Sequence, residues 1–251
     1  MGSKTPRVLT IGPGCGTERI PIAKRFGGKV VCIAVDSNLK TLLDVEALVR
    51  FAERRFIGER RNVGKKVQAE VQELVRRQEN RRVKLDFQNP DILRKQLLKI
   101  TRGELSCLRE IHWYGPAIWL GRPRWEDQIK RQGIRRFNDS DAAQKIVGVL
   151  IEFLEPSGWL YHITDKLEYS PLLGGLPKNE DYSARRQALS TRLRVVGAEL
   201  HRYGESTNPV NWRIGANNQD APKVKGIGIR NWMRQYTAHD SGFLVIARKT
   251  L

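Results

Sequence analysis

The chain has 251 residues, enough for one α/β domain, and 40% of them are hydrophobic, which allows a packed core and excludes wholesale disorder. Its three cysteines lie far apart, which excludes a disulfide framework and a zinc site, and no apolar run is long enough to cross a membrane. We therefore expect a soluble cytoplasmic protein without a metal site.

The charge of the chain is strongly positive and uneven. Lys and Arg total 45 against 27 acidic residues, a formal net charge of +18. Residues 50–136 carry a net +12 and residues 182–251 carry +8, whereas residues 137–181 carry −5. Two basic blocks thus flank an acidic stretch, which is typical either of an ordinary basic surface or of a protein with a polyanionic partner such as a nucleic acid.

The first half of the chain alternates between strand and helix patterns. A β-branched run at residues 8–11 predicts a strand, and a glycine-rich turn then leads into a helix over residues 17–26. The continuous apolar run at 30–35 predicts a buried parallel strand that ends at Asp36. The next predicted elements are helices over 39–55 and 65–79, a strand over 82–87, a helix over 91–100 and a strand over 104–113.

The second half continues the alternation but contains two long irregular segments. We expect a helix over 139–154, a strand over 159–164, a helix over 183–196, and strands over 198–203 and 242–247. Residues 114–138 and 204–240 are irregular and rich in Trp, Arg, Gly and Pro. This order predicts a single domain over 1–251, an α/β fold with a doubly wound, mostly parallel sheet and helices on both faces.

The strand–glycine loop–helix at residues 8–26 is the sharpest motif. Its glycines Gly12, Gly14 and Gly16 let a ligand approach the backbone, and the helix that follows offers free N–H groups. Asp36, at the tip of the second strand, can accept hydrogen bonds from both hydroxyls of a ribose. A nicotinamide fingerprint would need glycine at position 17, where Thr stands, so the spacing G-x-G-x-G favours another ribose-containing ligand.

At these residues the chain resembles the class I S-adenosylmethionine-dependent methyltransferases. The matching pieces are T-I-G-P-G-C-G-T-E, V-V-C-I-A-V-D, V-K-L-D-F, E-P-S-G-W-L-Y-H-I-T and G-F-L-V-I-A-R-K, in the family's order along nearly the whole chain. The resemblance implies a seven-stranded sheet whose last strand is antiparallel, with insertions after strand 4 (114–138) and between the last two strands (204–240).

The resemblance also implies a cofactor, S-adenosyl-L-methionine, and a set of residues that bind it. The three glycines would line its methionine and ribose side, Asp36 would hold the ribose hydroxyls, and Asp86 with Phe87 would meet the adenine. The chain departs from the family at Thr10, where an acid usually precedes the first glycine by two residues. That departure weakens cofactor binding or marks a divergent or inactive member.

Acceptor-side residues follow the fourth strand in this family. Here they would be His112 and Tyr114 as catalytic residues, with His112 the candidate base, and Trp113 as a stacking surface or pocket wall. Each also has an ordinary interpretation, since His112 can be a buried histidine and Trp113 a core residue. The signatures of base-amino, pyrimidine-carbon and ribose methylation do not match convincingly.

The two insertions interleave basic and aromatic residues, as surfaces that bind single-stranded or looped RNA do. The candidate substrate-binding residues in the first insertion are Trp119, Arg122, Arg124 and Trp125. We expect a methyltransferase whose acceptor is RNA or another nucleic acid. The alternatives are a small-molecule methyltransferase with a Trp-rich lid, or a non-catalytic protein of this fold that binds nucleic acid or a partner subunit. A partner subunit or a second copy can complete the site.

Overall fold

The computed structural model describes residues 5–12, 19, 22, 25–36, 69, 72–73, 75–114, 140–164, 167, 170–176, 182–206 and 242–251. The described strands form a seven-stranded sheet in the order β3-β2-β1-β4-β5-β7-β6. Their bounds are β1 Arg7–Ile11, β2 Val31–Asp36, β3 Glu79–Arg82, β4 Leu108–Tyr114, β5 Leu154–Thr164, β6 Ala198–Ser206 and β7 Gly242–Lys249. The five strands β1 to β5 pair in parallel, whereas β7 is antiparallel to both neighbours. The predicted fold class is confirmed.

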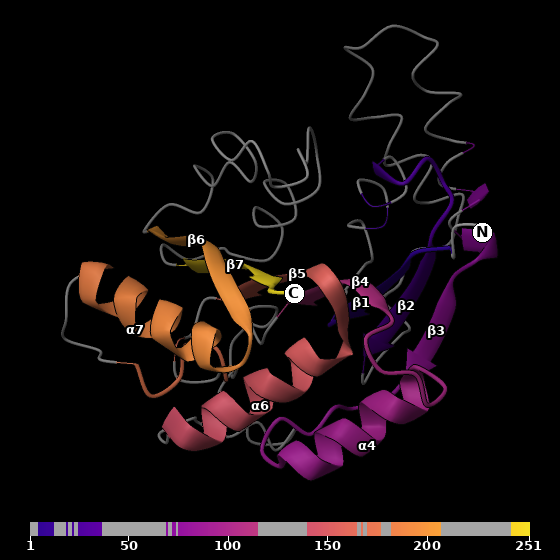
Figure 1. The fold of residues 1–251 in the computed structure, drawn as a ribbon. Coiled ribbons are helices and arrows are strands. Elements are labelled where there is room, and N and C mark those ends of the chain that lie inside the picture. The colour runs from indigo at the N-terminus through magenta and orange to yellow at the C-terminus, as the bar shows by residue number, and fades with distance from the viewer. Residues whose placement is uncertain are drawn as a thin grey trace, which may run out of the picture.

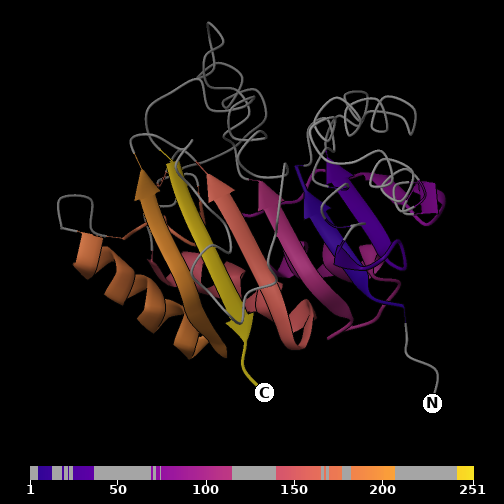
Figure 2. The same ribbon diagram turned by 90° about the horizontal axis from the view of Figure 1, so that it is seen from above.

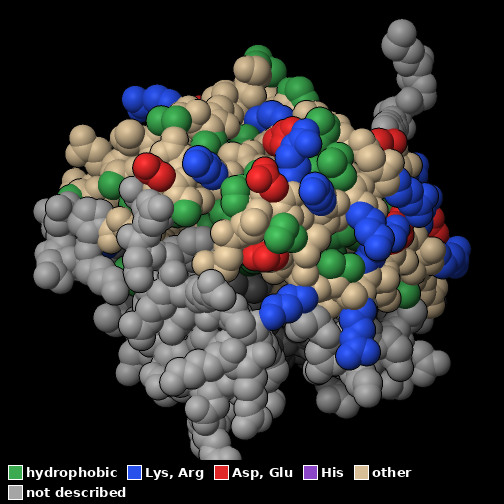
Figure 3. Space-filling model, turned by 90° about the horizontal axis from the view of Figure 1, so that it is seen from below, with side chains coloured by type: hydrophobic (Ala, Val, Ile, Leu, Met, Phe, Trp, Pro, Cys, Tyr) green, Lys and Arg blue, Asp and Glu red, His purple; other side chains and the backbone are tan. Residues whose placement is uncertain are grey.

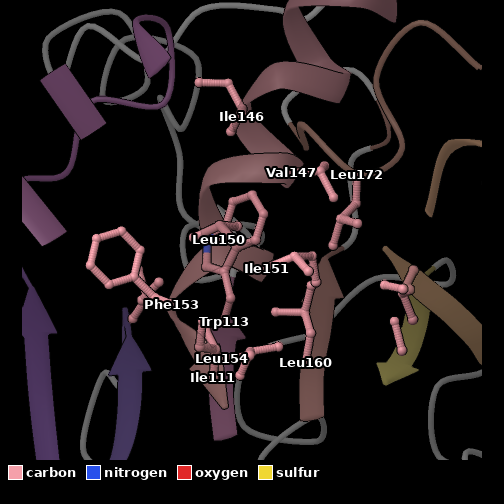
Figure 4. Packing of buried hydrophobic residues seen from close by; sticks show 14 of the residues in the cluster. Ile111, Trp113, Ile146, Val147, Leu150, Ile151, Phe153, Leu154, Leu160 and Leu172 are labelled. Carbon is pink, nitrogen blue, oxygen red and sulfur yellow. The ribbon is translucent and has the colours of Figure 1, made fainter. Parts of the chain in front are cut away.

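Three described helices cover one face of this sheet (Figures 1 and 2). They are α4 Pro90–Ile100, α6 Ser140–Phe153 and α7 Tyr182–Val195. Since side chains alternate between the faces of a strand, Ile111 of β4 and Leu160 of β5 point into the same layer as Ile146 and Leu150 of α6 (Figure 4). This interface is the main hydrophobic core.

The opposite face of the sheet has a smaller apolar cluster. It joins Val8 of β1, Cys32 of β2 and Val30 to Ile22, which lies in the helical stretch after the glycine loop. Residues 19, 22 and 25 are helical, which confirms the predicted helix over 17–26 at these positions, whereas Phe26 already lies in a turn. Both faces of the sheet are therefore covered, as a parallel sheet requires.

Helix α4 shows how the local sequence determines where a helix begins and which of its faces is buried. The Asn89 side chain accepts hydrogen bonds from the backbone N–H groups of Asp91 and Ile92, at 3.0 and 3.1 Å, and Pro90 occupies the first turn. Leu93, Leu97 and Ile100 form the buried stripe. The predicted helices over 91–100, 139–154 and 183–196 all match observed helices to within one residue at either end.

The prediction around the third strand was wrong in its bounds. The strand runs over Glu79–Arg82 rather than 82–87, and the helix predicted over 65–79 extends too far, because Glu79 already pairs with β2. Beyond Arg82 the chain bonds to α4 instead of a strand: Gln96 donates to the Lys84 carbonyl at 3.3 Å and accepts from the Asp86 N–H at 2.8 Å. The helix predicted over 39–55 lies outside the described residues.

The strands beside the predicted insertions extend further at their carboxyl ends than expected, although β4 begins at Leu108 and not at 104. β4 continues to Tyr114 and β6 to Ser206, so the segments predicted as 114–138 and 204–240 begin inside strands. The remainder of both segments lies outside the described residues. β5 begins at Leu154, directly after α6, and turns at Ser157 with φ 62° before its main ladder. Among the described helices, none is long and apolar enough to span a membrane.

Candidate functional site

The sheet offers a ligand site where its strand order reverses. β1 lies between β2 and β4, so the chain moves from β1 to β2 on one side and later returns to β4 on the other. In open α/β sheets, ligands bind beyond the carboxyl ends of the strands at this switch point. Gly12 and Asp36 both lie at that edge, on neighbouring strands.

Gly12 begins the glycine loop and has a conformation that favours glycine. Its φ is 66°, in the left-handed region, and its N–H donates to the Val35 carbonyl at 2.9 Å. That hydrogen bond continues the pairing of β1 with β2 by one residue, so the loop leaves the sheet beside the end of β2. Gly14 and Gly16 lie outside the described residues.

Asp36 is the last residue of β2 and is half-buried. It lies in register with Arg82 of β3, on the side of β2 away from β1. A carboxylate at the tip of this strand can accept hydrogen bonds from two adjacent hydroxyls, the pattern that a ribose presents. The Asp36 carboxylate, as a hydrogen-bond acceptor, and the glycine turn thus fit the ribose end of a nucleoside cofactor.

Asp86 and Phe87 lie in the loop between β3 and α4. The Asp86 carboxylate accepts the Gln88 N–H at 2.8 Å, which closes a tight turn. The Phe87 ring stacks on Trp113, with 4.6 Å between the ring centroids and 8° between the planes. Two predicted site residues, one from the cofactor side and one from the acceptor side, are thus in contact.

Trp113 points into the core layer of the sheet. It is 3% exposed and lies between Phe87 and His162, whose ring centroid is 4.0 Å away. This geometry favours core packing for Trp113, while its contact with an acceptor stays a prediction.

His162 is a fully buried histidine that the sequence analysis did not single out. Its Nδ1 lies 3.1 Å from the Trp113 carbonyl and its Nε2 lies 2.8 Å from the Ser170 hydroxyl. Since a carbonyl only accepts, Nδ1 carries the proton and Nε2 accepts from Ser170. Burial lowers the pKa of His162 to about 3, so the ring is neutral and ties β5 to the loop that follows it.

The opposite face of β4 holds a buried charged triad of Arg25, Glu110 and His112. The Glu110 carboxylate accepts a charge-assisted hydrogen bond from Arg25 and lies 2.6 Å from Nε2 of His112. Glu110 and His112 are 2% and 4% exposed. The His112 ring stacks on Tyr161 of β5, with 4.6 Å between the centroids. The triad connects β4 to the helical stretch that follows the glycine loop.

The electrostatics of the triad fix its protonation at neutral pH. Burial alone would raise the pKa of Glu110, but Arg25 and the hydrogen bond from His112 outweigh burial and hold this pKa below its usual value. Burial also lowers the pKa of His112, and this effect exceeds the opposing attraction of Glu110. His112 is therefore neutral, with its proton on Nε2 toward Glu110, and Nδ1 is the basic nitrogen.

The remaining predicted site residues are only partly described. Tyr114 ends β4 at the carboxyl edge, and its side chain is not among the described ones. Trp119, Arg122, Arg124 and Trp125 lie outside the described residues. Within the described residues, no group of three or more His, Cys, Asp or Glu side chains could hold a metal ion.

Sequence reasoning missed the partners of His112. Glu110 precedes His112 by two residues, so both side chains point to the same face of a strand. That Glu-x-His spacing was a usable signal for their contact. Arg25 offered no such signal, because it lies 85 residues from Glu110 along the chain.

No protein-family model and no curated protein matches this sequence. Its structure is similar to several solved methyltransferases. The aminoglycoside resistance methyltransferase NpmB1 is 12% identical, over 99% of this chain and 89% of that one, with a TM-score of 0.44. The 16S rRNA methyltransferase KamB is 10% identical, over 98% and 88%, with a TM-score of 0.44. A SAM-dependent methyltransferase from Methanosarcina mazei is 12% identical, over 99% and 95%, with a TM-score of 0.43. These identities and scores are low, and we base the function on this chain's own residues.

Proposed function

We propose that this protein is an S-adenosylmethionine-dependent methyltransferase whose acceptor is RNA. The observation that carries the proposal is the position of Gly12 and Asp36 at the ends of neighbouring strands, at the switch point of a seven-stranded sheet with an antiparallel β7. A close-approach turn beside a ribose-binding carboxylate suits a nucleoside cofactor. The antiparallel β7 is the arrangement implied by the methyltransferase resemblance.

Each candidate residue has a defined part in binding the cofactor. Gly12, with Gly14 and Gly16, would let the methionine and ribose portions approach the backbone, and Asp36 would accept from the two ribose hydroxyls. Phe87, which stacks on Trp113, and Asp86 would be the residues that contact the adenine. When bound, S-adenosylmethionine supplies an electrophilic methyl group on a sulfonium sulfur.

The acceptor side requires orientation more than chemistry. Transfer needs the acceptor atom in line with the methyl group and a place for any proton that the acceptor loses. His112 is held in one tautomer by Glu110, so its Nδ1 is a defined basic position, and Tyr114 is the last residue of the same strand. Trp119, Arg122, Arg124 and Trp125 would contact the RNA from the first insertion. The net charge of +18 supports RNA over a cationic acceptor.

Calorimetric titration with S-adenosylhomocysteine tests the cofactor part of the proposal. We expect micromolar binding to the wild-type protein and a loss of roughly 1–3 kcal/mol in Asp36→Ala, because bound hydroxyls lose their acceptor. Glu199→Ala is a suitable control, since Glu199 is an exposed acid on edge strand β6. Unchanged affinity in Asp36→Ala would contradict the ribose assignment, and no binding to the wild type would favour a non-catalytic role.

Transfer of a labelled methyl group tests the acceptor. We expect label from S-adenosylmethionine to appear in ribosomal or transfer RNA and to be lost in Asp36→Ala. If label instead enters only small molecules of a cell extract, the acceptor is a small molecule and the RNA part of the proposal fails.

A further inference from the structure

The outer surface of α4 and the adjoining edge of the sheet carry a concentration of positive charge. Residues 75–103 contain nine Lys and Arg against three acidic residues. Figure 3 looks onto the α4–α6 side of the molecule, and Lys and Arg side chains gather on its right, where α4 and β3 lie in Figure 1. We define the α4 strip by its five cationic residues on this surface, Arg81, Lys84, Lys95, Lys99 and Arg102.

Ion pairs and a hydrogen bond join α4 to β3 and to the loop that follows β3. Arg102, beyond the end of α4, and Arg81 of β3 both bond to Glu79, at 3.2 and 2.9 Å. In the middle of the helix, Gln96 donates to the Lys84 carbonyl at 3.3 Å. The helix therefore lies beside β3 and the loop that follows it, and the cations of the strip lie along its middle and its carboxyl end.

Among the described residues, the ion pairs of the strip neutralise only part of its positive charge. Glu79 is shared between Arg81 and Arg102, and Arg102 is still 68% exposed. Lys95 and Lys99 are exposed and one helical turn apart, and neither forms an ion pair within the described part of the chain. Like charges held close together on a fixed helix repel, so an anionic partner that neutralises them binds favourably.

We propose that the α4 strip is a docking surface for the phosphate backbone of double-stranded RNA. This inference rests on the proposed function and assigns the surface on which its RNA acceptor is held. Lys95 and Lys99 are about 6 Å apart along the axis of α4, and Arg102 continues the row beyond the end of the helix, so the strip can contact more than one phosphate. Gln96, which follows Lys95 in α4, accepts from the Asp86 N–H at 2.8 Å, so the middle of the strip lies beside the expected adenine site.

The chemistry of the strip favours a duplex over other anionic partners. Its polar surface has no apolar centre of the kind that protein interfaces bury; Ile92 and Leu105, 41% and 42% exposed, are the large exposed apolar residues among the described positions 75–114. The apolar stripe of α4, Leu93, Leu97 and Ile100, is buried in the core and cannot enter a membrane. The strip itself has no aromatic side chain on which single-stranded bases could stack.

Binding of a labelled 20-base-pair RNA duplex, measured by fluorescence anisotropy at several salt concentrations, tests the proposal. The variant Lys95→Gln/Lys99→Gln/Arg102→Gln removes three charges from the strip. We expect its affinity to fall about tenfold or more, and the slope of log affinity against log salt to become shallower by roughly two to three, since each phosphate contact contributes about 0.9 for B-form DNA.

A matched control removes the same charge from the rest of the helical layer. Lys145 of α6 and Arg186 and Arg194 of α7 are exposed, so Lys145→Gln/Arg186→Gln/Arg194→Gln has an equal net charge. We expect this control to keep most of the affinity and the slope. Equal losses in the two variants would overturn the proposal, because the effect would then belong to the net charge. Competition by polyglutamate as effective as unlabelled duplex would also overturn it.

Calorimetry with S-adenosylhomocysteine on the same proteins separates this proposal from the proposed function. A wild type that binds S-adenosylhomocysteine but not the duplex overturns the strip and leaves the methyltransferase standing. A wild type that binds the duplex through the strip but does not bind S-adenosylhomocysteine supports the strip and contradicts the methyltransferase proposal. If the triple variant fails to fold, the single variant Lys99→Glu, at an exposed position, gives the same comparison against Lys145→Glu.

Discussion

Replacing Glu110 by Gln should destabilise the protein by removing one charge from its buried triad. The Glu110 side chain is 2% exposed and that of its partner Arg25 is 15% exposed, so water cannot replace the lost carboxylate. Loss of one partner of a buried ion pair typically costs 3–5 kcal/mol. Because the Gln oxygen can still accept hydrogen bonds and Arg25 keeps some contact with water, we expect about 3 kcal/mol.

The pH dependence of this effect has a definite sign. The pKa of Glu110 in the folded protein is below its ordinary value of 4.5, so its contribution to stability is present above about pH 4.5 and is lost as the pH falls through the folded pKa. The difference in unfolding free energy between the wild type and Glu110→Gln should therefore be largest near pH 7. It should shrink as the pH falls below about 4.5.

Urea denaturation between pH 7 and pH 3 measures this difference, with Glu152→Gln as the control. Glu152 bonds to Arg94 through both carboxylate oxygens, but the two side chains are 35% and 43% exposed, so this pair should contribute at most about 1 kcal/mol. A loss in Glu110→Gln no larger than that in Glu152→Gln, or a difference that stays constant with pH, would refute the reasoning.

Three further changes test other parts of the structure. His162→Gln should reduce the loss of stability at acid pH. Because the pKa of His162 is about 3 in the folded protein and 6.5 in a free side chain, the unfolding free energy of the wild type should fall by about 1.4 kcal/mol for each pH unit below 6.5. Urea midpoints of both proteins at pH 6 and pH 4 measure this difference. Gly158→Ala should lower the melting temperature by an amount equivalent to about 1–3 kcal/mol, since its Cβ would lie 2.8 Å from the Glu155 carbonyl oxygen and 3.1 Å from that of Leu108. Arg192→Met should cost about 1–3 kcal/mol in thermal unfolding, because it removes the guanidinium donor to three loop carbonyls, at 2.7–3.2 Å; a normal melting temperature would show that other donors replace it.

Elements with a regular hydrophobic pattern could be predicted from the sequence, and elements without one could not. The helix at Pro90–Ile100 has a cap, a proline at its start and a complete apolar stripe, and it was predicted within one residue. The strand at Glu79–Arg82 reads Glu-Asn-Arg-Arg and has no hydrophobic residue, so no strand pattern was visible. It lies at the edge of the sheet, where charged side chains are common because they discourage pairing with other chains.

In the candidate site, some positions could likewise be predicted from local sequence patterns, whereas others depend on contacts between residues far apart in the chain. Gly12 and Asp36 follow strands whose parallel pairing could be predicted, so their common place at the carboxyl edge could be predicted as well. The partnership of Arg25 with Glu110 depends on how a helix lies across two strands, and no local pattern encodes it. The burial of Trp113 between Phe87 and His162 likewise depends on three separate elements.

The triad also bears on the departure at Thr10, which in the sequence suggested a weakened cofactor site. Thr10 is fully buried, its hydroxyl donates to the Ile33 carbonyl at 3.4 Å, and it lies in register with His112 of the neighbouring strand. Strand β1 thus lacks a carboxylate at this level, whereas β4 brings one on the same face through Glu110, bonded to His112 and to Arg25. The stretch after the glycine loop is therefore anchored by a carboxylate from β4. The absence of an acid at position 10 therefore does not by itself indicate an inactive site. The affinity of Glu110→Gln for S-adenosylhomocysteine, compared with that of the wild type, tests whether the Glu110 carboxylate supports the cofactor site.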